Sequence, residues 1–371
     1  MDIFSCYKKD DLPFVRISAP MVRYTKLPFR LLLRQHNVDL VHTPMILANS
    51  FIRSEKARNI EFTTCSSDRP LIVQLASNDP CEFTIATEMV APYCDGVDLN
   101  CGCPQSWAMN SGLGSALLRE PEKIANIIHA ARNTIPRWRD SNAENYAMSN
   151  DNTMVLNNYN QVENKFKSIT RLQGPFSVSA KIRIPTACNR SAGEGSSCDP
   201  IKLTVELVRR LAVMGVDWVT LHARTPQQRS RDSASWNMVR ELVDCKIKHS
   251  YLGTDIPIIL NGDVRELKDA YYAHETTGCH GVMVGRALLK SPYLFVPNYI
   301  KDDNSLCHLF ENWLLLSAQY TGGTNFVTLH QQAYWMMEPF LDKTNRLILH
   351  SIGSFPGLVD WLFDHRKTKN Y

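Results

Sequence analysis

Short apolar runs recur along the chain, and most of them are followed by a stretch in which apolar residues return at helical spacing. We distinguish eight runs, at residues 15–21, 39–45, 70–76, 96–100, 176–182, 217–223, 256–262 and 281–285. Several are rich in β-branched residues and apolar almost throughout, which is typical of strands buried on both faces of a parallel sheet. Eight successive units of strand and helix predict an α/β fold of the (β/α)8 TIM barrel type.

The helices between the runs are clearest at residues 121–133 and 200–215. The first begins with a proline, which suits the first turn of a helix, and the second ends at Gly215, a common residue just beyond a helix. A doubly wound parallel sheet is the competing architecture. It normally has fewer strands and a GxGxxG motif after the first one, and this chain has no such motif.

Two stretches interrupt the barrel pattern, near residues 138–168 and 185–200. The first is rich in asparagine and has only a weak period, and the second is rich in Gly, Ser and Pro. Both compositions are typical of surface loops. We therefore predict a barrel domain over residues 12–300 that carries two insertions.

After Pro297 the strand-like runs stop and the pattern becomes helical. Amphipathic stretches follow at residues 306–320, 328–341 and 357–367. The sequence thus predicts a separate C-terminal helical domain over residues 301–371.

The composition is that of a folded globular protein, with 44% apolar and 21% charged residues among 371, and a net charge of +4. This mild positive charge permits a polyanionic partner but does not require one. The 11 cysteines form no CxxC motif and have no histidines at zinc spacing, so no metal is expected. No signal peptide and no apolar run near the roughly 18 residues of a membrane span is found. We expect a soluble protein of the cytoplasm, with the nucleus as an alternative.

Polar and ionisable residues follow most of the predicted strands, at the end of a barrel where active sites are found. Each of them alone could cap a helix or line a turn, but together they favour a functional site. The candidates are the residues at these strand ends, including the apolar residues and glycines that stand among the polar ones: Pro20, Met21, Val22, Gln74, Asn100, Lys181, Arg183, His222, Arg224, Asn261, Gly262, Asp263, Gly285 and Arg286.

The last two turns of the barrel suggest a phosphate site. Gly262 and Gly285 would let backbone N–H groups approach an anion, and Arg286 can grip two phosphate oxygens. The alternative is that these are tight turns beside a solvated arginine. Gln74 can pair with the edge of a flat heterocycle, and Lys181 would stabilise the negative charge of a reduced flavin. Together these groups fit FMN lying across the barrel mouth.

Two cysteines, Cys101 and Cys103, stand in the segment DLNCGCPQSWAMNSGLGSALL at the end of the fourth run. If a flavin hydride reduces a C=C bond, the other carbon needs a proton, which a thiol can supply. Cys103 is held in a turn before Pro104, whereas Cys101 is nearer the strand. The alternative is that both are small buried hydrophobic residues. The residues alone leave this choice open.

The motifs SAPMVRYTKLPFR, LIVQLASND, DLNCGCPQ with GLGSALL, VSAKIRI, LHART, NGDV and VGRALL occur in this order across residues 15–290. In this respect the chain resembles the tRNA-dihydrouridine synthases, and most of all the eukaryotic type that acts on D-loop uridines 20a and 20b. The resemblance implies a tRNA substrate, and FMN bound by the candidate residues apart from Arg183 and Arg224. It implies that NADPH, or NADH, reduces the FMN. Hydride then passes to C6 of uridine, and Cys103 protonates C5.

The resemblance also implies that Arg183 contacts the substrate nucleotide. We expect Arg224, with Arg229 and Arg231 on the same loop, to contact tRNA phosphates, although a solvated surface loop is an equal alternative. The protein is expected to act as a monomer. Two other functions are considered: an FMN enzyme of a small molecule, similar to dihydroorotate dehydrogenase, and a barrel that binds RNA without catalysis.

Overall fold

The computed structural model describes residues 4–7, 12–135, 138–139, 174–186, 199–320 and 323–368. The predicted insertions near 138–168 and 185–200 therefore lie largely outside the described residues.

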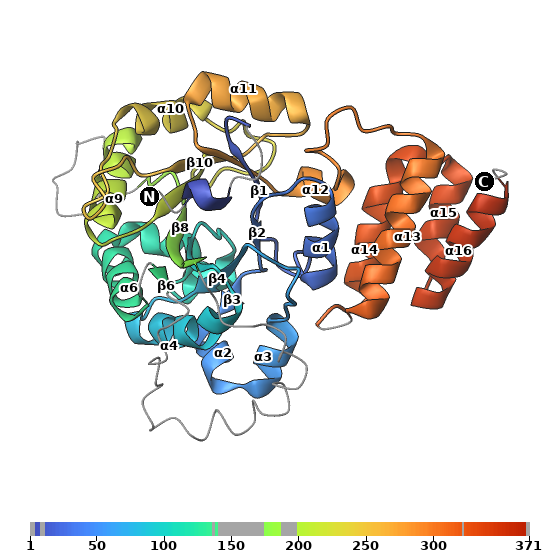
Figure 1. Ribbon diagram of the computed structural model, residues 1–371, viewed down its shortest axis with the longest axis horizontal. Helices are drawn as coiled ribbons and strands as arrows, with labels where there is room; N and C mark the ends of the chain where they lie inside the picture. The colour runs from blue at the N-terminus through green and yellow to red at the C-terminus, as the bar shows by residue number, and fades with distance from the viewer. Residues whose placement is uncertain are drawn as a thin grey trace.

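Eight parallel strands form the centre of the molecule. They are β1 (Val15–Ser18), β2 (Val41–His42), β4 (Leu71–Ala76), β5 (Gly96–Cys101), β8 (Ser177–Arg183), β9 (Trp218–His222), β10 (Ile258–Asn261) and β11 (Gly281–Val284). Each pairs with the next in the order β2-β4-β5-β8-β9-β10-β11-β1. The ring closes where the N–H of Ser18 donates to the carbonyl of Leu40 at 3.0 Å. The prediction of a (β/α)8 barrel is confirmed, and every predicted strand is present (Figure 1).

Helices surround the strands, as Figure 1 shows. The longer ones are α1 (Leu27–Gln35), α4 (Pro80–Val90), α6 (Pro121–Thr134), α9 (Pro200–Val213), α10 (Trp236–Asp244) and α11 (Leu267–Thr277). Shorter elements are α2 (Ala48–Arg53), α3 (Glu55–Glu61), α5 (Ser106–Asn110) and α12 (Arg286–Lys290). A short strand, β3 (Ile46–Leu47), pairs with β4, and β6 (Trp138–Arg139) pairs with β7 (Gly174–Pro175) in a separate antiparallel ladder.

The N-terminal end of the barrel is plugged. The rings of Phe4 and Tyr7, from the short helical turn η1 (Phe4–Tyr7), lie 5.4 and 5.7 Å from the ring of Trp218 at the start of β9. All three side chains are buried and belong to an apolar cluster inside the barrel. The Tyr7 hydroxyl also donates to the carbonyl of Asp95, just before β5. The C-terminal ends of the strands therefore form the accessible end.

Four helices follow the barrel: α13 (Asp303–Gln319), α14 (Phe326–Met337), α15 (Lys343–Ser351) and α16 (Phe355–Thr368). They lie beside α1 and α12 (Figure 1). Gln332 of α14 donates to the carbonyl of Tyr24, and the ring of Trp335 lies 5.0 Å from the Tyr24 ring. Since Tyr24 belongs to the loop after β1, the helical tail contacts one of the loops at the barrel mouth.

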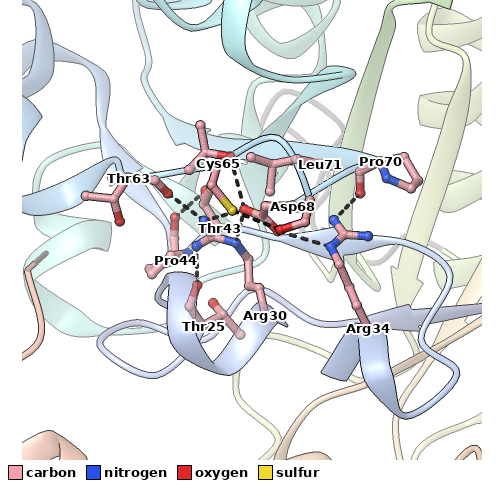
Figure 2. Close-up of polar contacts among 12 residues, drawn as sticks. Thr25, Arg30, Arg34, Thr43, Pro44, Thr63, Cys65, Asp68, Pro70 and Leu71 are labelled. Atoms are coloured by element: carbon pink, nitrogen blue, oxygen red, sulfur yellow. Dashed lines mark hydrogen bonds and ion pairs between the residues drawn. The ribbon is translucent and has the colours of Figure 1, made fainter. Parts of the chain in front are cut away.

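A network of buried ion pairs also holds the loop after β1, on the side away from the helical tail. Figure 2 shows the guanidinium groups of Arg30 and Arg34 converging on Asp68, whose side chain is fully buried. Arg30 donates to Asp68 Oδ2 through Nε at 2.9 Å and Nη2 at 2.7 Å, and Arg34 Nε donates to Oδ1 at 3.1 Å. Arg30 Nη1 also donates to the carbonyl of Thr25 at 2.7 Å. The hydroxyl of Thr25 bonds to both the N–H and the carbonyl of Met21, so the network reaches the predicted site.

Candidate active site

Polar side chains of three neighbouring strands form rows inside the barrel. Gln74 of β4 lies opposite Asp98 of β5, and Asp98 lies opposite Ser179 of β8. One row nearer the strand ends, Asn100 lies opposite Lys181. Because residues two apart on a strand point to the same side, the alternation brings all five into the barrel, where they are buried.

Hydrogen bonds join these side chains into a chain that leads to Cys103. Asp98 accepts from Gln74 Nε2 through Oδ2 and from the Ser179 hydroxyl through Oδ1, both at 2.7 Å. Gln74 Oε1 accepts from Asn100 Nδ2 at 2.7 Å, and Asn100 Oδ1 accepts from the N–H of Cys103 at 3.0 Å. Gln74 and Asn100, both predicted to touch a cofactor, thus have one N–H each left for a ligand.

The two cysteines have different surroundings. Cys101 is completely buried in the main apolar core, and burial, together with the charge of Asp98, raises the pKa of its thiol well above the usual value. Cys103 lies two residues after β5 and is partly exposed. Of the pair, Cys103 is the thiol that a ligand at the mouth can reach.

The glycine-rich run after the cysteines packs against the Cys103 loop. The N–H and the hydroxyl of Ser115 donate to the carbonyl of Cys103 at 2.9 and 3.0 Å. Gly114 has a φ of +61°, and a Cβ there would lie 2.6 Å from the same carbonyl oxygen. The spacing between CGCP and GLGS therefore places Gly114 and Ser115 against the carbonyl of Cys103.

Gly114→Ala is expected to displace this loop. The added Cβ overlaps with Cys103, and this overlap comes on top of the usual cost of a side chain at a positive φ. We therefore expect a destabilisation about 1–3 kcal/mol larger than in a variant with a positive φ and no overlap. The control is Gly253→Ala, at a φ of +67° with nothing within 4 Å of the added Cβ. Urea unfolding and the alkylation rate of Cys103 measure both effects. Equal destabilisation of the two variants and an unchanged alkylation rate would contradict the packing argument.

Cations surround the mouth near Cys103. Burial, and then the charge of Arg183, lower the pKa of Lys181 to about 8, while the charges of Asp98 and Cys103 act in the opposite direction. Burial and the charge of Arg224 lower the pKa of Arg183 to about 10. The segments are close together, since a Cβ at Gly102, the neighbour of Cys103, would lie 3.4 Å from the carbonyl oxygen of Lys181 and 3.7 Å from Cγ of Arg183.

His222, at the end of β9, is neutral. Burial and four neighbouring cations lower its pKa to about 2. Arg224 Nη1 lies 3.3 Å from His222 Nε2 and can only donate, so Nε2 accepts and Nδ1 carries the proton. The imidazole is therefore an uncharged N–H donor in a positively charged surrounding.

Arg224, which we expect to contact tRNA phosphates, makes contacts within the protein. Its side chain is only 2% exposed, donates to the carbonyl of Asp232 and forms an ion pair with Asp263. Burial raises the pKa of Asp263, but the hydrogen bonds from Arg224 and from the N–H of Ala234 outweigh it and hold this pKa below its usual value. In this structure Arg224 and Asp263 join the loops after β9 and β10, whereas Arg229 and Arg231 are exposed.

The remaining predicted residues line the rim. Gly262 has a φ of +130°, and a Cβ there would lie 2.9 Å from Ala234. Asn261 donates to the carbonyl of Met283 at 2.8 Å, and Arg286 is exposed. Gly285 faces the loop after β1, where a Cβ would come 3.6 Å from the sulfur of Met21. Pro20 is half-buried and Val22 exposed on that loop.

Donor atoms without a protein partner converge on this mouth. Within the described residues, Lys181 Nζ has no hydrogen-bond partner, and Arg183 Nε is buried without one. Cationic side chains with unused N–H groups fit an anionic ligand, because an anion would compensate their desolvation. Together with the free N–H of Gln74 and the glycine turns at β10 and β11, this donor set fits a flat heterocycle with a phosphate, as FMN has.

The sequence analysis did not identify two ionisable residues inside the barrel, Asp98 and His42. Asp98 lies two residues before Asn100, so strand alternation could have placed it in the barrel. His42 ends β2, which is too short to show alternation. Its Nδ1 bonds to the carbonyl of Ser18, its Nε2 is buried without a partner, and burial lowers its pKa to about 3.

The part of the chain that the structure describes holds no group of three or more His, Cys, Asp or Glu side chains able to bind a metal ion. None of the helices within the same ranges is both long and apolar enough to cross a bilayer.

Comparisons with known proteins agree with the motifs. The family model for dihydrouridine synthase matches residues 17–138 and 156–334. A mouse tRNA-dihydrouridine(20a/20b) synthase-like protein, whose name includes NAD(P)+, is 35% identical over 353 residues, or 95% of this chain and 89% of its own. The human protein of that name is 34% identical over 95% and 90%. The tRNA-dihydrouridine(20a/20b) synthase of Saccharomyces cerevisiae is 32% identical over 96% and 81%.

Proposed function

Because the chain belongs to the dihydrouridine synthase family, we propose that it reduces uridines of tRNA to 5,6-dihydrouridine, with NADPH or NADH as reductant. Positions 20a and 20b are the proposed targets, because the names of the mouse and yeast relatives specify them. The observation that carries the proposal is the accessible Cys103 at the barrel mouth, on a loop that packs against Lys181 and Arg183 at the end of β8. A thiol in this place can act as an acid toward a ligand that enters the mouth.

FMN is the proposed cofactor. When bound, it would supply the hydride that adds to C6 of the uracil ring. Gln74 would donate its remaining N–H to the ring, and the charge of Lys181 would stabilise the reduced, anionic form. Arg286 and the turns at Gly262 and Gly285 would hold the phosphate. Support comes from the unpartnered Lys181 Nζ and from the neutral N–H donor that His222 offers.

Cys103 would donate its thiol proton to C5 of the uracil. The thiolate that remains lies near the charges of Lys181 and Arg183, which stabilise it until it regains a proton from water at the mouth. Arg183, whose Nη1 is tied to the carbonyl of Thr225 while its Nε has no partner, is proposed to contact the nucleotide. The uridine must leave its stack to reach this site, and a single-stranded loop lowers that cost.

Mass spectrometry of nucleosides tests the function. Unmodified tRNA is incubated with the protein and NADPH, digested and searched for a uridine heavier by two hydrogens. A signal that maps to positions 20a and 20b is the expected result. If the protein carries redox-active flavin but reduces free uracil or orotate in place of tRNA, it is an enzyme of small molecules and the proposal fails.

The affinity for FMN is expected to fall as the pH rises above about 8. Lys181 is charged below its pKa of about 8 and neutral above it, and a charged ammonium makes the stronger hydrogen bond to the acceptor atoms of the flavin ring. Since one proton is involved, the fall is at most about tenfold per pH unit. Quenching of flavin fluorescence between pH 7 and 9 measures it. Lys181→Met should bind FMN more weakly and with a flat profile, and an equal slope in both proteins would exclude Lys181 as the cause.

A further inference from the structure

Asp98 is a buried carboxylate that the proposed reaction does not use. Its side chain is fully buried at the level of Gln74 and Ser179, one row below Lys181. Both of its oxygens accept hydrogen bonds at 2.7 Å, from Gln74 and from Ser179. A buried carboxylate costs free energy unless its environment compensates it, so its presence below the mouth needs a reason.

The hydrogen-bond chain that starts at Asp98 has a direction. An ionised carboxylate can only accept, so Gln74 must turn its NH2 toward Asp98 and its oxygen toward Asn100. At the other end, the N–H groups of Gly102 and Cys103 can only donate, so Asn100 must turn its oxygen toward them, at 3.3 and 3.0 Å. Both ends therefore demand the same orientation of the two amides between them.

We propose that Asp98 is a positioning residue for the proton transfer by Cys103, acting through Gln74 and Asn100. It fixes which end of each amide faces the next group and thereby keeps an acceptor under the N–H of Cys103. Without an acceptor at position 98, the Gln74 amide loses its preferred orientation. If it turns over, Asn100 must turn as well, and its NH2 would face the N–H of Cys103. Two donors repel, so the loop would move away.

This inference rests on the proposed function for its effect on the reaction, but the placement of the loop can be measured without it. The series of hydrogen bonds from Asp98 to Cys103 also predicts which substitutions compensate each other. Asn100→Asp places a second carboxylate beside Gln74, which has a single NH2 group for two acceptors. Adding Asp98→Asn to Asn100→Asp restores one donor for every acceptor, with Gln74 turned over and Ser179 still donating to residue 98.

The test therefore compares Asp98→Asn, Asn100→Asp, the double variant Asp98→Asn/Asn100→Asp and Asp98→Val. In Asn100→Asp and in Asp98→Val we expect the Cys103 loop to be displaced. A displacement of about 1 Å is expected to lower kcat about 100-fold with little change in KM. Asp98→Asn should stay near the wild type, since its oxygen can face Gln74 while Ser179 accepts from its NH2 and donates to the carbonyl of Val97, 3.3 Å away. The double variant should recover the placement of the Cys103 loop but only part of kcat, because the turned Gln74 and the carboxylate at position 100 no longer offer their N–H groups to the ring.

The second readout is the alkylation rate of Cys103 in the flavin-loaded protein, followed by peptide mass spectrometry with buried Cys101 as internal reference. We expect a changed rate in Asn100→Asp and a wild-type rate in the double variant. Urea unfolding identifies variants that fail to fold, and the double variant keeps the test valid if Asp98→Val is one of them. A folded double variant as impaired as Asn100→Asp, by both readouts, would overturn the proposal. A wild-type protein that leaves tRNA unchanged refutes the proposed function alone, since the alkylation rates still report the loop.

Discussion

Cys103→Ala is expected to lose most of the formation of dihydrouridine while it still binds FMN and tRNA. Removal of a general acid costs about 10²- to 10⁴-fold in rate, and Cys103 is the accessible thiol of the pair at the mouth. The change removes one sulfur atom from a partly exposed position, so the fold and the donors that face the cofactor should remain. Mass spectrometry of the product, flavin absorbance and a tRNA gel-shift assay measure the three properties separately.

Cys101→Ala is the matched control, because it removes the same atom two residues away. Its thiol lies in the core with a raised pKa and cannot reach a ligand at the mouth. We expect most of the activity to remain, together with a modest loss of stability from the small cavity. An inactive Cys101→Ala protein alongside an active Cys103→Ala protein would reverse the assignment of the proton donor.

Asp68→Ala is expected to cause the largest loss of stability. It removes the carboxylate on which Arg30 and Arg34 converge and leaves two buried guanidinium groups without their counter-charge. Breaking a buried pair by removal of one partner typically costs about 3–5 kcal/mol, because the remaining charge stays desolvated. Urea-induced unfolding measures the loss directly, provided that the unfolding is two-state.

The control for Asp68→Ala is Lys248→Ala, which breaks the surface pair between Lys248 and Asp255. Exposed pairs contribute about 0–1 kcal/mol, so this variant should unfold near the wild type. A similar small effect of Asp68→Ala would show that water or a rearrangement compensates the two arginines. Because Arg30 also holds the carbonyl of Thr25, Asp68→Ala should in addition weaken FMN binding.

The sequence was informative wherever a pattern repeats over many residues. Burial on both faces made the strands readable as apolar runs, and the chain order of the strands placed Lys181 and Cys103 at the same end of the barrel. Directional contacts were not readable, because they depend on register between strands. The link from Asp98 to Gln74 requires that two residues 24 positions apart lie opposite each other.

Arg224 illustrates the same limit. Its position after a strand suggested a contact with substrate, and nothing in the local sequence indicated that Asp263, 39 residues later, would pair with it. Gly114 is the opposite case. The sequence displayed the glycine-rich run, but the reason for it emerged only when the carbonyl of Cys103 was found where a Cβ would have to be.

The plug formed by Phe4, Tyr7 and Trp218 has a consequence for the order of events in a catalytic cycle. A barrel closed at one end has a single entrance, so under the proposed function the nicotinamide and the uridine would approach the FMN ring from the same side. We expect the two ligands to exclude each other there. The oxidised nicotinamide would therefore leave before the tRNA delivers its base, which makes the kinetics ping-pong and makes each substrate an inhibitor that competes with the other.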